Sequence, residues 1–140
     1  PELTFIWFGY TAKIALKINV RQAMDNLPAN IILPGYVRGP IIEGAFSDAD
    51  AFFFPSFEET EGIVVLEALA AQCPVLVRDI GAFDPWLINE KNCLKANTVE
   101  GFVKQLRRIT TKQVDTTPEG YKTAKERDLP EIGKQLKAVY

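Results

Sequence analysis

The sequence predicts an α/β fold with a Rossmann-like, mostly parallel sheet and helices on both of its faces. Short apolar runs alternate along the chain with longer segments of helical periodicity. Some of these runs are continuous rather than alternating, which is typical of parallel strands covered on both faces. Strands that alternate with helices form right-handed βαβ units, and such units build a mostly parallel sheet.

Five strands are expected, because five apolar runs are bounded by residues that end a strand. They cover residues 3–8, 31–33, 51–54, 74–77 and 93–95. Gly9 stops the first run, and the pair Pro34 and Gly35 stops the second. The third run is continuous and is therefore expected to be covered on both faces. The aromatic side chains of Trp7, Phe52, Phe53 and Phe54 are expected in the core.

Seven helical segments are expected from periodicity and from the residues at their ends. They cover residues 20–27, 40–48, 62–72, 82–88, 97–109, 118–127 and 130–140, with a polar linker over 110–117. Pro28 closes the first helix, and Pro40 lies in the first turn of the second. Asn97 and Glu100 form a capping pair for the fifth.

Composition excludes several classes of protein. The chain has 140 residues, a net charge of −2 and no long basic run, so nucleic acid is not an expected partner. No apolar run approaches the roughly 18 residues of a membrane-spanning helix. The chain has no His, the commonest general base and metal ligand. Cys73 and Cys93 lie in apolar segments and are expected to be reduced core thiols, which suits a cytoplasmic location.

The most informative stretch is FFFPSFEETEGIVVLEALAAQ, residues 52–72, which predicts a buried strand, an acidic turn and an apolar helix. Open α/β sheets bind ligands where a loop leaves the carboxyl end of a strand and opens a helix. The helix carries one carboxylate, Glu67, and burying it without a partner would be costly. Glu59 in the turn and Glu67 are therefore candidates to bind vicinal hydroxyls of a sugar or ribose. The alternative is that Glu67 marks the single wet face of the helix and that the turn is solvated.

Three further positions at the same sheet edge are candidates. The helix start at Gly62 offers free N–H groups suited to a phosphate, or is an ordinary tight turn. Tyr36 to Arg38 follow the second strand and could flank a flat base, although Arg38 could equally be a surface residue. Arg78 and Asp79 end the fourth strand, where they could contact a ligand or pair with each other.

The segment PSFEETEGIVVLEALAAQCPVLVRDIG resembles the nucleotide-sugar-binding motif of the retaining glycosyltransferases of family 4, which have the two-domain GT-B fold. The resemblance covers residues 3–109. The family pattern falls on Pro55, Ser56, Glu59, Glu67, Ala68, Pro74 and Val75. One departure is that the Gly-Phe-Gly usual after the first Glu is Thr60-Glu61-Gly62 here.

The resemblance implies a role for each part of the motif. Glu59 would be the catalytic-site carboxylate that binds the donor sugar, and Glu67 would bind the ribose. The loop amides would approach the sugar and diphosphate, and the segment after the second strand would flank the base. The implied donor-binding residues are Tyr36, Val37, Arg38, Glu59, Thr60, Glu61, Gly62, Ile63, Val64 and Glu67.

The resemblance also implies the organisation of the protein. Residues 1–109 would be a partial donor-binding domain, 110–117 a linker, and 118–140 helices that pack back on it or toward an N-terminal acceptor domain. The family's first strand and its basic diphosphate clamp are missing, so the chain is expected to be a fragment that is inactive alone.

The implied reaction transfers a hexose, from uridine diphosphate (UDP) glucose, to an acceptor hydroxyl. The wording of the motif is closest to enzymes of Gram-positive bacteria that glycosylate diacylglycerol or its glycolipids. No metal or other cofactor is expected, and the complete enzyme would be cytoplasmic and peripheral on the inner membrane face. The alternatives are a non-enzymatic α/β module, such as a receiver-like signalling domain, and a sugar-nucleotide epimerase with the GT-B fold.

Overall fold

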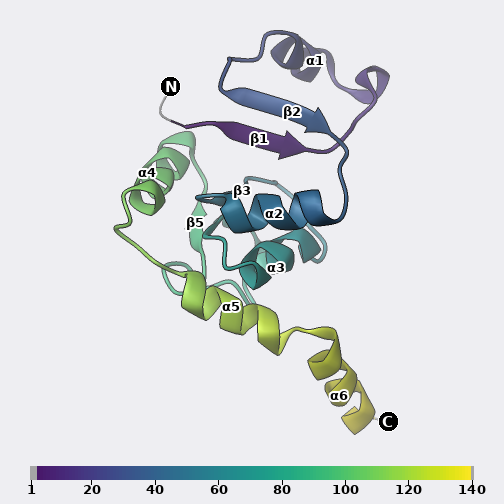
Figure 1. Cartoon of the computed structure of the whole chain (residues 1–140), viewed down its shortest axis with the longest axis vertical. Helices are drawn as coiled ribbons and strands as arrows, with labels where there is room; N and C mark the ends of the chain where they lie inside the picture. Colours follow the sequence, from purple (N-terminus) through teal and green to yellow (C-terminus); the bar gives the residue numbers. More distant parts are fainter. Residues whose placement is uncertain (1–2, 140) are drawn as a thin grey trace. The chain divides into compact units, whose positions relative to one another are not determined.

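A computed structural model describes residues 3–139 of the chain (Figure 1). The chain divides into two compact units, residues 1–42 and 43–140, and each is described by itself. Tyr140, the last residue of the final expected helix, lies outside the described residues, as do residues 1–2.

The first unit is built around two parallel strands, β1 (Phe5–Phe8) and β2 (Ile31–Gly35). The connection between them contains a short 3-10 helix, η1 (Lys13–Ala15), and α1 (Ile18–Asp25). β2 runs through Pro34, where the sequence predicted that it would end. Proline is tolerated there because β2 pairs with β1 alone among the described strands, and an edge strand can spare an N–H group.

The strands of this unit have little cover. Within residues 3–12 and 14–42 the side chains are half-buried or exposed. Ile6 and Trp7 of β1 are 54% and 47% exposed, and Ile32 of β2 is 47% exposed. The prediction that Trp7 lies in the core is therefore wrong, because about half of its side chain is open to solvent.

The second unit contains a three-stranded parallel sheet in the order β3-β4-β5. Its strands are β3 (Phe52–Phe54), β4 (Val75–Arg78) and β5 (Leu94–Ala96). The central strand β4 is buried along most of its length. α3 (Ile63–Ala70) connects β3 to β4, and a short 3-10 helix, η2 (Gly81–Phe83), follows β4.

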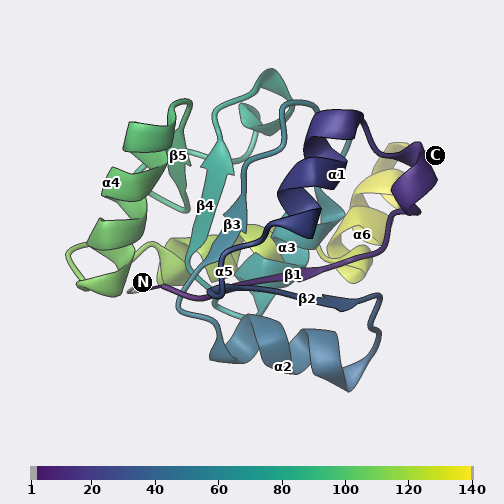
Figure 2. The same ribbon diagram turned by 90° about the horizontal axis from the view of Figure 1, so that it is seen from above.

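Four further helices complete the chain. α2 (Pro40–Asp48) has the predicted bounds and ends in the second unit. α4 (Val99–Thr110) follows β5 and lies on the face of the sheet opposite α3 (Figure 2). α5 (Thr117–Glu126) packs against α3, and α6 (Leu129–Val139) continues from α5 (Figure 1).

The core of the second unit lies on both faces of its sheet. Val65, Ala68 and Leu69 of α3 pack in one cluster with β4, at the i, i+3, i+4 spacing of a single helix face. On the other face the ring of Phe53 meets that of Phe102 of α4 at 5.1 Å between centroids. Phe52 meets a ring of α2 at 5.3 Å. The prediction that the third strand is covered on both faces is thus confirmed.

Both cysteines are free thiols in this core, as predicted. Burial raises the pKa of Cys73 to about 11 and that of Cys93 to about 12. Neither thiol is therefore appreciably ionised near neutral pH.

Three local predictions were wrong. The expected helix over 82–88 is only η2 followed by turns, because Pro85 has no N–H group with which to continue the helical hydrogen bonds. The N-cap of α4 is Thr98 rather than Asn97, since the Thr98 Oγ1 accepts the Gly101 N–H at 3.1 Å. α3 ends at Ala70, and Gln72 adopts a left-handed φ of 57° that stops the helix.

The predicted fold class is confirmed. Every described strand pair is parallel, and helices lie on both faces of the three-stranded sheet. Among residues 3–139, no helix combines the length and apolar character needed to cross a membrane.

Candidate functional site

The loop between β3 and α3 has the predicted place at the carboxyl end of a parallel strand. β3 ends at Phe54, and α3 begins at Ile63, with Gly62 as its N-cap. Gly62 is buried and has a left-handed φ of 69°. A Cβ atom there would lie 2.7 Å from Cε1 of Phe83. Both the backbone conformation and the close approach of that ring require glycine.

The start of α3 presents backbone donors. The N–H groups of Val65 and Leu66 donate to the Gly62 carbonyl at 2.8 and 3.3 Å. In the described part of the chain, the amides of Gly62, Ile63 and Val64 donate to no protein acceptor. Free amides at the positive end of a helix suit an anion such as a phosphate.

The two motif carboxylates have different surroundings. Glu59 is half-buried, and its Oε1 accepts the N–H of Thr60 at 2.8 Å, so the side chain folds onto its own loop. Glu67 is exposed, on a face of α3 shared with the exposed Ile63 and Ala70. Within residues 3–139 it makes no ion pair or hydrogen bond through its carboxylate.

The argument that Glu67 is a buried charge in need of a partner was therefore wrong. The helix is apolar in composition on this face, yet the face is open to solvent, so the carboxylate is hydrated. This is the wet-face alternative, and it leaves the carboxylate available to a ligand. The other loop residues, Glu58, Thr60 and Glu61, are exposed as well.

Tyr36, Val37 and Arg38 belong to the first unit and follow the end of β2. Tyr36 is 64% exposed. The Arg38 Nε donates to the Tyr36 Oη at 2.6 Å, and its guanidinium carbon lies 4.9 Å from the ring centroid. The side chains of Tyr36 and Arg38 thus contact each other through a hydrogen bond and a cation–π interaction. The structure brings residues 59–64 together in the β3–α3 loop and the first turn of α3, but Tyr36, Val37 and Arg38 lie in the other unit.

Arg78 and Asp79, at the end of β4, do not pair with each other as one alternative supposed. The Arg78 Nε donates to the carbonyl of Pro55, and its Nη1 donates to that of Asn97, both at 2.9 Å. Its guanidinium carbon lies 3.9 Å from the ring centroid of Phe57. Arg78 is therefore bound to the β3–α3 loop.

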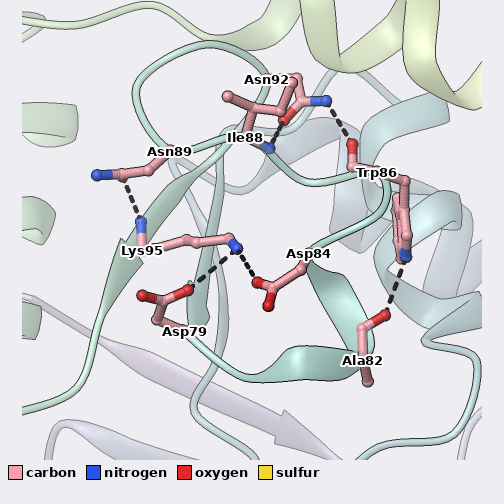
Figure 3. A network of polar contacts seen from close by, with 8 residues as sticks. All are labelled: Asp79, Ala82, Asp84, Trp86, Ile88, Asn89, Asn92 and Lys95. Atoms are coloured by element: carbon pink, nitrogen blue, oxygen red, sulfur yellow. Dashed lines mark hydrogen bonds and ion pairs between the residues drawn. The ribbon is translucent and has the colours of Figure 1, made fainter.

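Asp79 belongs to a polar network with Lys95 of β5 (Figure 3). The Lys95 Nζ lies 3.0 Å from Asp79 Oδ1 and 3.2 Å from Asp84 Oδ1, and its side chain is only 8% exposed. Burial alone lowers the pKa of Lys95, but the hydrogen bonds and charges of the two carboxylates outweigh it, and the net shift is upward. Sequence reasoning missed this network, whose single signal was a lysine in a short strand.

A second polar network ties α5 to the segment after η2. The buried Asn92 accepts the Ile88 N–H at 2.7 Å and donates to the Trp86 carbonyl at 2.8 Å (Figure 3). It also donates to the Thr123 Oγ1 of α5 at 2.9 Å. No local pattern in the sequence pointed to this residue.

Two open hollows lie away from the motif. One of about 920 Å³ lies over α4, between Glu90 and Arg107, and one of about 710 Å³ lies between α5 and α6. Neither includes Glu59 or Glu67. We favour the loop as the site, because it has the free amides and the left-handed glycine. Among the described residues, no group of three or more His, Cys, Asp or Glu could hold a metal ion.

Comparison with known proteins finds relatives whose names describe the synthesis of diacylglycerol glycolipids. A processive diacylglycerol alpha-glucosyltransferase of Acholeplasma laidlawii is 45% identical over 141 residues, which is 100% of this chain and 42% of that protein. An alpha-galactosylglucosyldiacylglycerol synthase of Streptococcus pneumoniae is 30% identical over 86 residues, 59% of this chain and 23% of that protein. The chain thus spans less than half the length of these relatives.

Solved structures share the fold at low sequence identity. Anabaena HepE in complex with UDP-glucose is 18% identical with a TM-score of 0.79, over 99% of this chain and 41% of that one. The pneumococcal O-GlcNAc transferase GtfA, in complex with UDP and GlcNAc, is 21% identical with a TM-score of 0.70, over 99% of this chain and 29% of that one.

The family itself follows from the extent of one match. Residues 2–112 match the family of glycosyl transferases group 1, and this segment includes both units' strands and the whole motif from Pro55 to Val75. The prediction that the chain comes from a glycosyltransferase is thereby confirmed: the chain belongs to the glycosyl transferases group 1.

Proposed function

We propose that this chain is the donor-binding domain of a retaining glycosyltransferase of family 4, which moves a hexose from a nucleotide sugar to an acceptor hydroxyl. The observation that carries the proposal is the motif loop at the carboxyl end of β3, with Glu59 in the loop and Glu67 on the helix that it opens. Parallel α/β sheets bind nucleotides at this edge.

Each part of the loop has a proposed role. The amides of Gly62, Ile63 and Val64 receive the diphosphate, because they are free and lie at the positive end of α3. Glu59 accepts hydroxyls of the donor sugar at the catalytic centre, together with the adjoining backbone of Thr60 and Glu61. Glu67 accepts the ribose hydroxyls, for which its exposed carboxylate is available.

The segment after β2 is the part of the first unit to which we assign the base, as the family resemblance implies. Tyr36 is exposed, and Val37 is half-buried beside it, so ring and backbone offer a flat surface. Arg38 covers the Tyr36 ring and would move aside or stack with the base.

The proposed chemistry needs no protein nucleophile. Departure of the sugar places negative charge on the diphosphate, and oriented N–H groups stabilise that charge in the transition state. Glu59 holds the sugar in the geometry in which the acceptor hydroxyl attacks as the bond from the sugar to the diphosphate breaks, and the proton of the hydroxyl passes to the departing diphosphate. Residues 1–109 thus form the donor part, 110–117 link it to residues 118–140, and the acceptor site lies in the remainder of the protein.

The donor and acceptor are proposed from the relatives. HepE was solved with UDP-glucose, and the Acholeplasma relative is named for glucosyl transfer to diacylglycerol. We assign UDP-glucose as donor and a diacylglycerol lipid or glycolipid as acceptor. Such an acceptor lies in a membrane, so the complete protein would work in the cytoplasm as a peripheral protein on the inner membrane face.

Ligand binding tests the donor proposal. The complete protein is titrated with the diphosphates of uridine, guanosine and adenosine and with UDP-glucose, followed by ligand-observed NMR. Selective binding of the uridine ligands is expected. Glu67→Ala should weaken UDP and UDP-glucose alike, and Glu59→Ala should weaken UDP-glucose more. Glu126→Ala, which removes an exposed carboxylate from α5, is the control and should change neither. Unchanged affinity in Glu67→Ala would remove the ribose role.

Activity tests the acceptor proposal. The complete protein is incubated with labelled UDP-glucose and lipid vesicles that contain or lack diacylglycerol. Label is expected in the lipid phase only with diacylglycerol or its monoglucosyl derivative present, and Glu59→Gln should lower the rate. Label that appears as free glucose, or as an isomerised nucleotide sugar, would instead favour a hydrolase or an epimerase.

A further inference from the structure

Arg78 connects the two loops that flank its own strand. It is the last residue of β4, which lies between β3 and β5. Its Nε donates at 2.9 Å to the carbonyl of Pro55, the first residue after β3. Its Nη1 donates at 2.9 Å to the carbonyl of Asn97, the first residue after β5. One planar guanidinium therefore fixes the exits of both neighbouring strands.

The same guanidinium holds the next part of the motif loop by stacking. Its carbon lies 3.9 Å from the ring centroid of Phe57 and 5.2 Å from that of Phe102. Phe57 is 78% exposed, so its position owes little to burial. The cation–π interaction with the Arg78 guanidinium instead holds the Phe57 ring in place. The segment from Pro55 to Phe57 is thus set by Arg78.

The far end of the loop is set independently. Gly62 is buried against the ring of Phe83, and η2, which carries Phe83, is followed by Asp84, a partner of Lys95. Between these two anchors lies Glu59, whose side chain bonds only to the adjacent Thr60 N–H among the described residues. The place of Glu59 therefore depends on both ends of the loop.

We propose that Arg78 is a positioning residue for the donor site: through Pro55 and Phe57 it holds the first half of the loop so that Glu59 meets the sugar. The proposal rests on the donor-binding function proposed above. Arg78 is not assigned a contact with the nucleotide sugar, because two of its N–H groups and one face of its guanidinium already contact protein groups. A lysine would not substitute, because an ammonium group cannot make both directed bonds and stack.

The test compares two ligands that differ by the sugar. Affinities of the complete protein for UDP and for UDP-glucose are measured by calorimetry in the wild type, Arg78→Met and Arg108→Met. Arg108 is the control, since Arg108→Met also removes a guanidinium held by protein groups, here Glu90 and Gln105, but Arg108 lies on α4 away from the loop. Arg78→Met should weaken UDP-glucose about tenfold and UDP about twofold or less, while Arg108→Met leaves both within about twofold.

A second readout follows the loop without any ligand. Amide hydrogen exchange of the peptide over residues 55–62 should quicken in Arg78→Met, while exchange over α5 stays as in the wild type. If Arg78→Met does not fold, Arg78→Lys is used for both measurements, because it keeps the charge and loses the fork.

The outcomes separate the two proposals. Equal loss of UDP and UDP-glucose, or unchanged affinity with unchanged loop exchange, overturns the role of Arg78 and leaves the donor function standing. A wild-type protein that binds neither ligand overturns the donor function. In that case the exchange of residues 55–62 alone decides whether Arg78 orders the loop.

Discussion

The two units of this chain contain the same kinds of elements and differ in what covers their strands. β1–β2 in the first unit and β3–β4–β5 in the second are both parallel. Every buried hydrophobic residue of the described chain belongs to the second unit, whereas β1 and β2 leave Ile6, Trp7 and Ile32 largely exposed. Local sequence patterns therefore form strands and helices in both, but only one of the units has a core.

The difference matters because parallel sheets are normally covered on both faces. In the second unit α3 and α4 supply this cover with Leu69 and Phe102, each of which contributes about 1.5–3 kcal/mol when fully buried. A two-stranded sheet without such cover is marginally stable in water. The motif loop belongs to the second unit, so the hydrophobic core of that unit supports the geometry of the loop.

Hydrogen exchange gives the largest expected difference between the units. In the intact chain the amides of β4 should exchange only through global unfolding, whose free energy is on the order of 5 kcal/mol. Their hydrogen exchange should therefore be slowed at least about a thousandfold. The amides of β1, a strand of the same length, should exchange far faster. Equal protection of β1 and β4 would contradict the comparison, and would mean that the first unit is covered after all.

Large-to-small substitution should separate the units by a smaller amount. Leu69→Ala removes a side chain that is 1% exposed and should lower the free energy of unfolding by about 2–5 kcal/mol. Ile6→Ala removes one that is 54% exposed and should cost less than about 1 kcal/mol. Urea unfolding of both variants measures this. A cost of Ile6→Ala near that of Leu69→Ala would show an unrecognised core.

Glycine substitutions make the same comparison at Gly62, the N-cap of α3, and at Gly35, the last residue of β2. Gly62 and Gly35 both have a positive φ, 69° and 86°. A Cβ at Gly62 meets Phe83 at 2.7 Å, whereas at Gly35 nothing lies within 4 Å. Gly35→Ala should therefore cost only the backbone term of about 1–2 kcal/mol, and Gly62→Ala should cost up to about 3 kcal/mol more, for overpacking. Thermal unfolding checks the order, and equal shifts would remove the steric role of Phe83.

Sequence reasoning found the elements but not the ties between them. The helix over 40–48 was predicted at its observed bounds because a Pro at the first turn marks its start. The loop after Phe54 was predicted because turn residues follow a continuous apolar run. These signals are local, so a single sequence contains them.

The ties join residues that are distant in sequence. Arg78 bonds to Pro55, and Asn92 bonds to Thr123, across 23 and 31 positions. No local pattern specifies such partners, because tertiary packing decides them. Glu67 was misjudged for a related reason. A helix that is apolar all round has no periodicity to reveal which face is open, and here the open face includes Ile63.

The smallest effect concerns the ion pairs that Lys95 makes with Asp79 and Asp84 in the second unit. The pKa of Lys95 is raised from its ordinary value of 10.5, because the pull of Asp79 and Asp84 exceeds the opposing effect of burial. A group with a raised pKa contributes stability that is fully present below its unfolded pKa and is lost as pH rises through the folded one. Wild type should therefore exceed Lys95→Met in unfolding free energy at pH 8, and the gap should narrow above about pH 10.5.

The carboxylates are 50% and 66% exposed, so screening keeps the pH-dependent part below about 1 kcal/mol. Urea unfolding at a series of pH values measures the gap. A gap that widened as Lys95 lost its proton would show that the neutral amine, not the ion pair, is the form that stabilises η2.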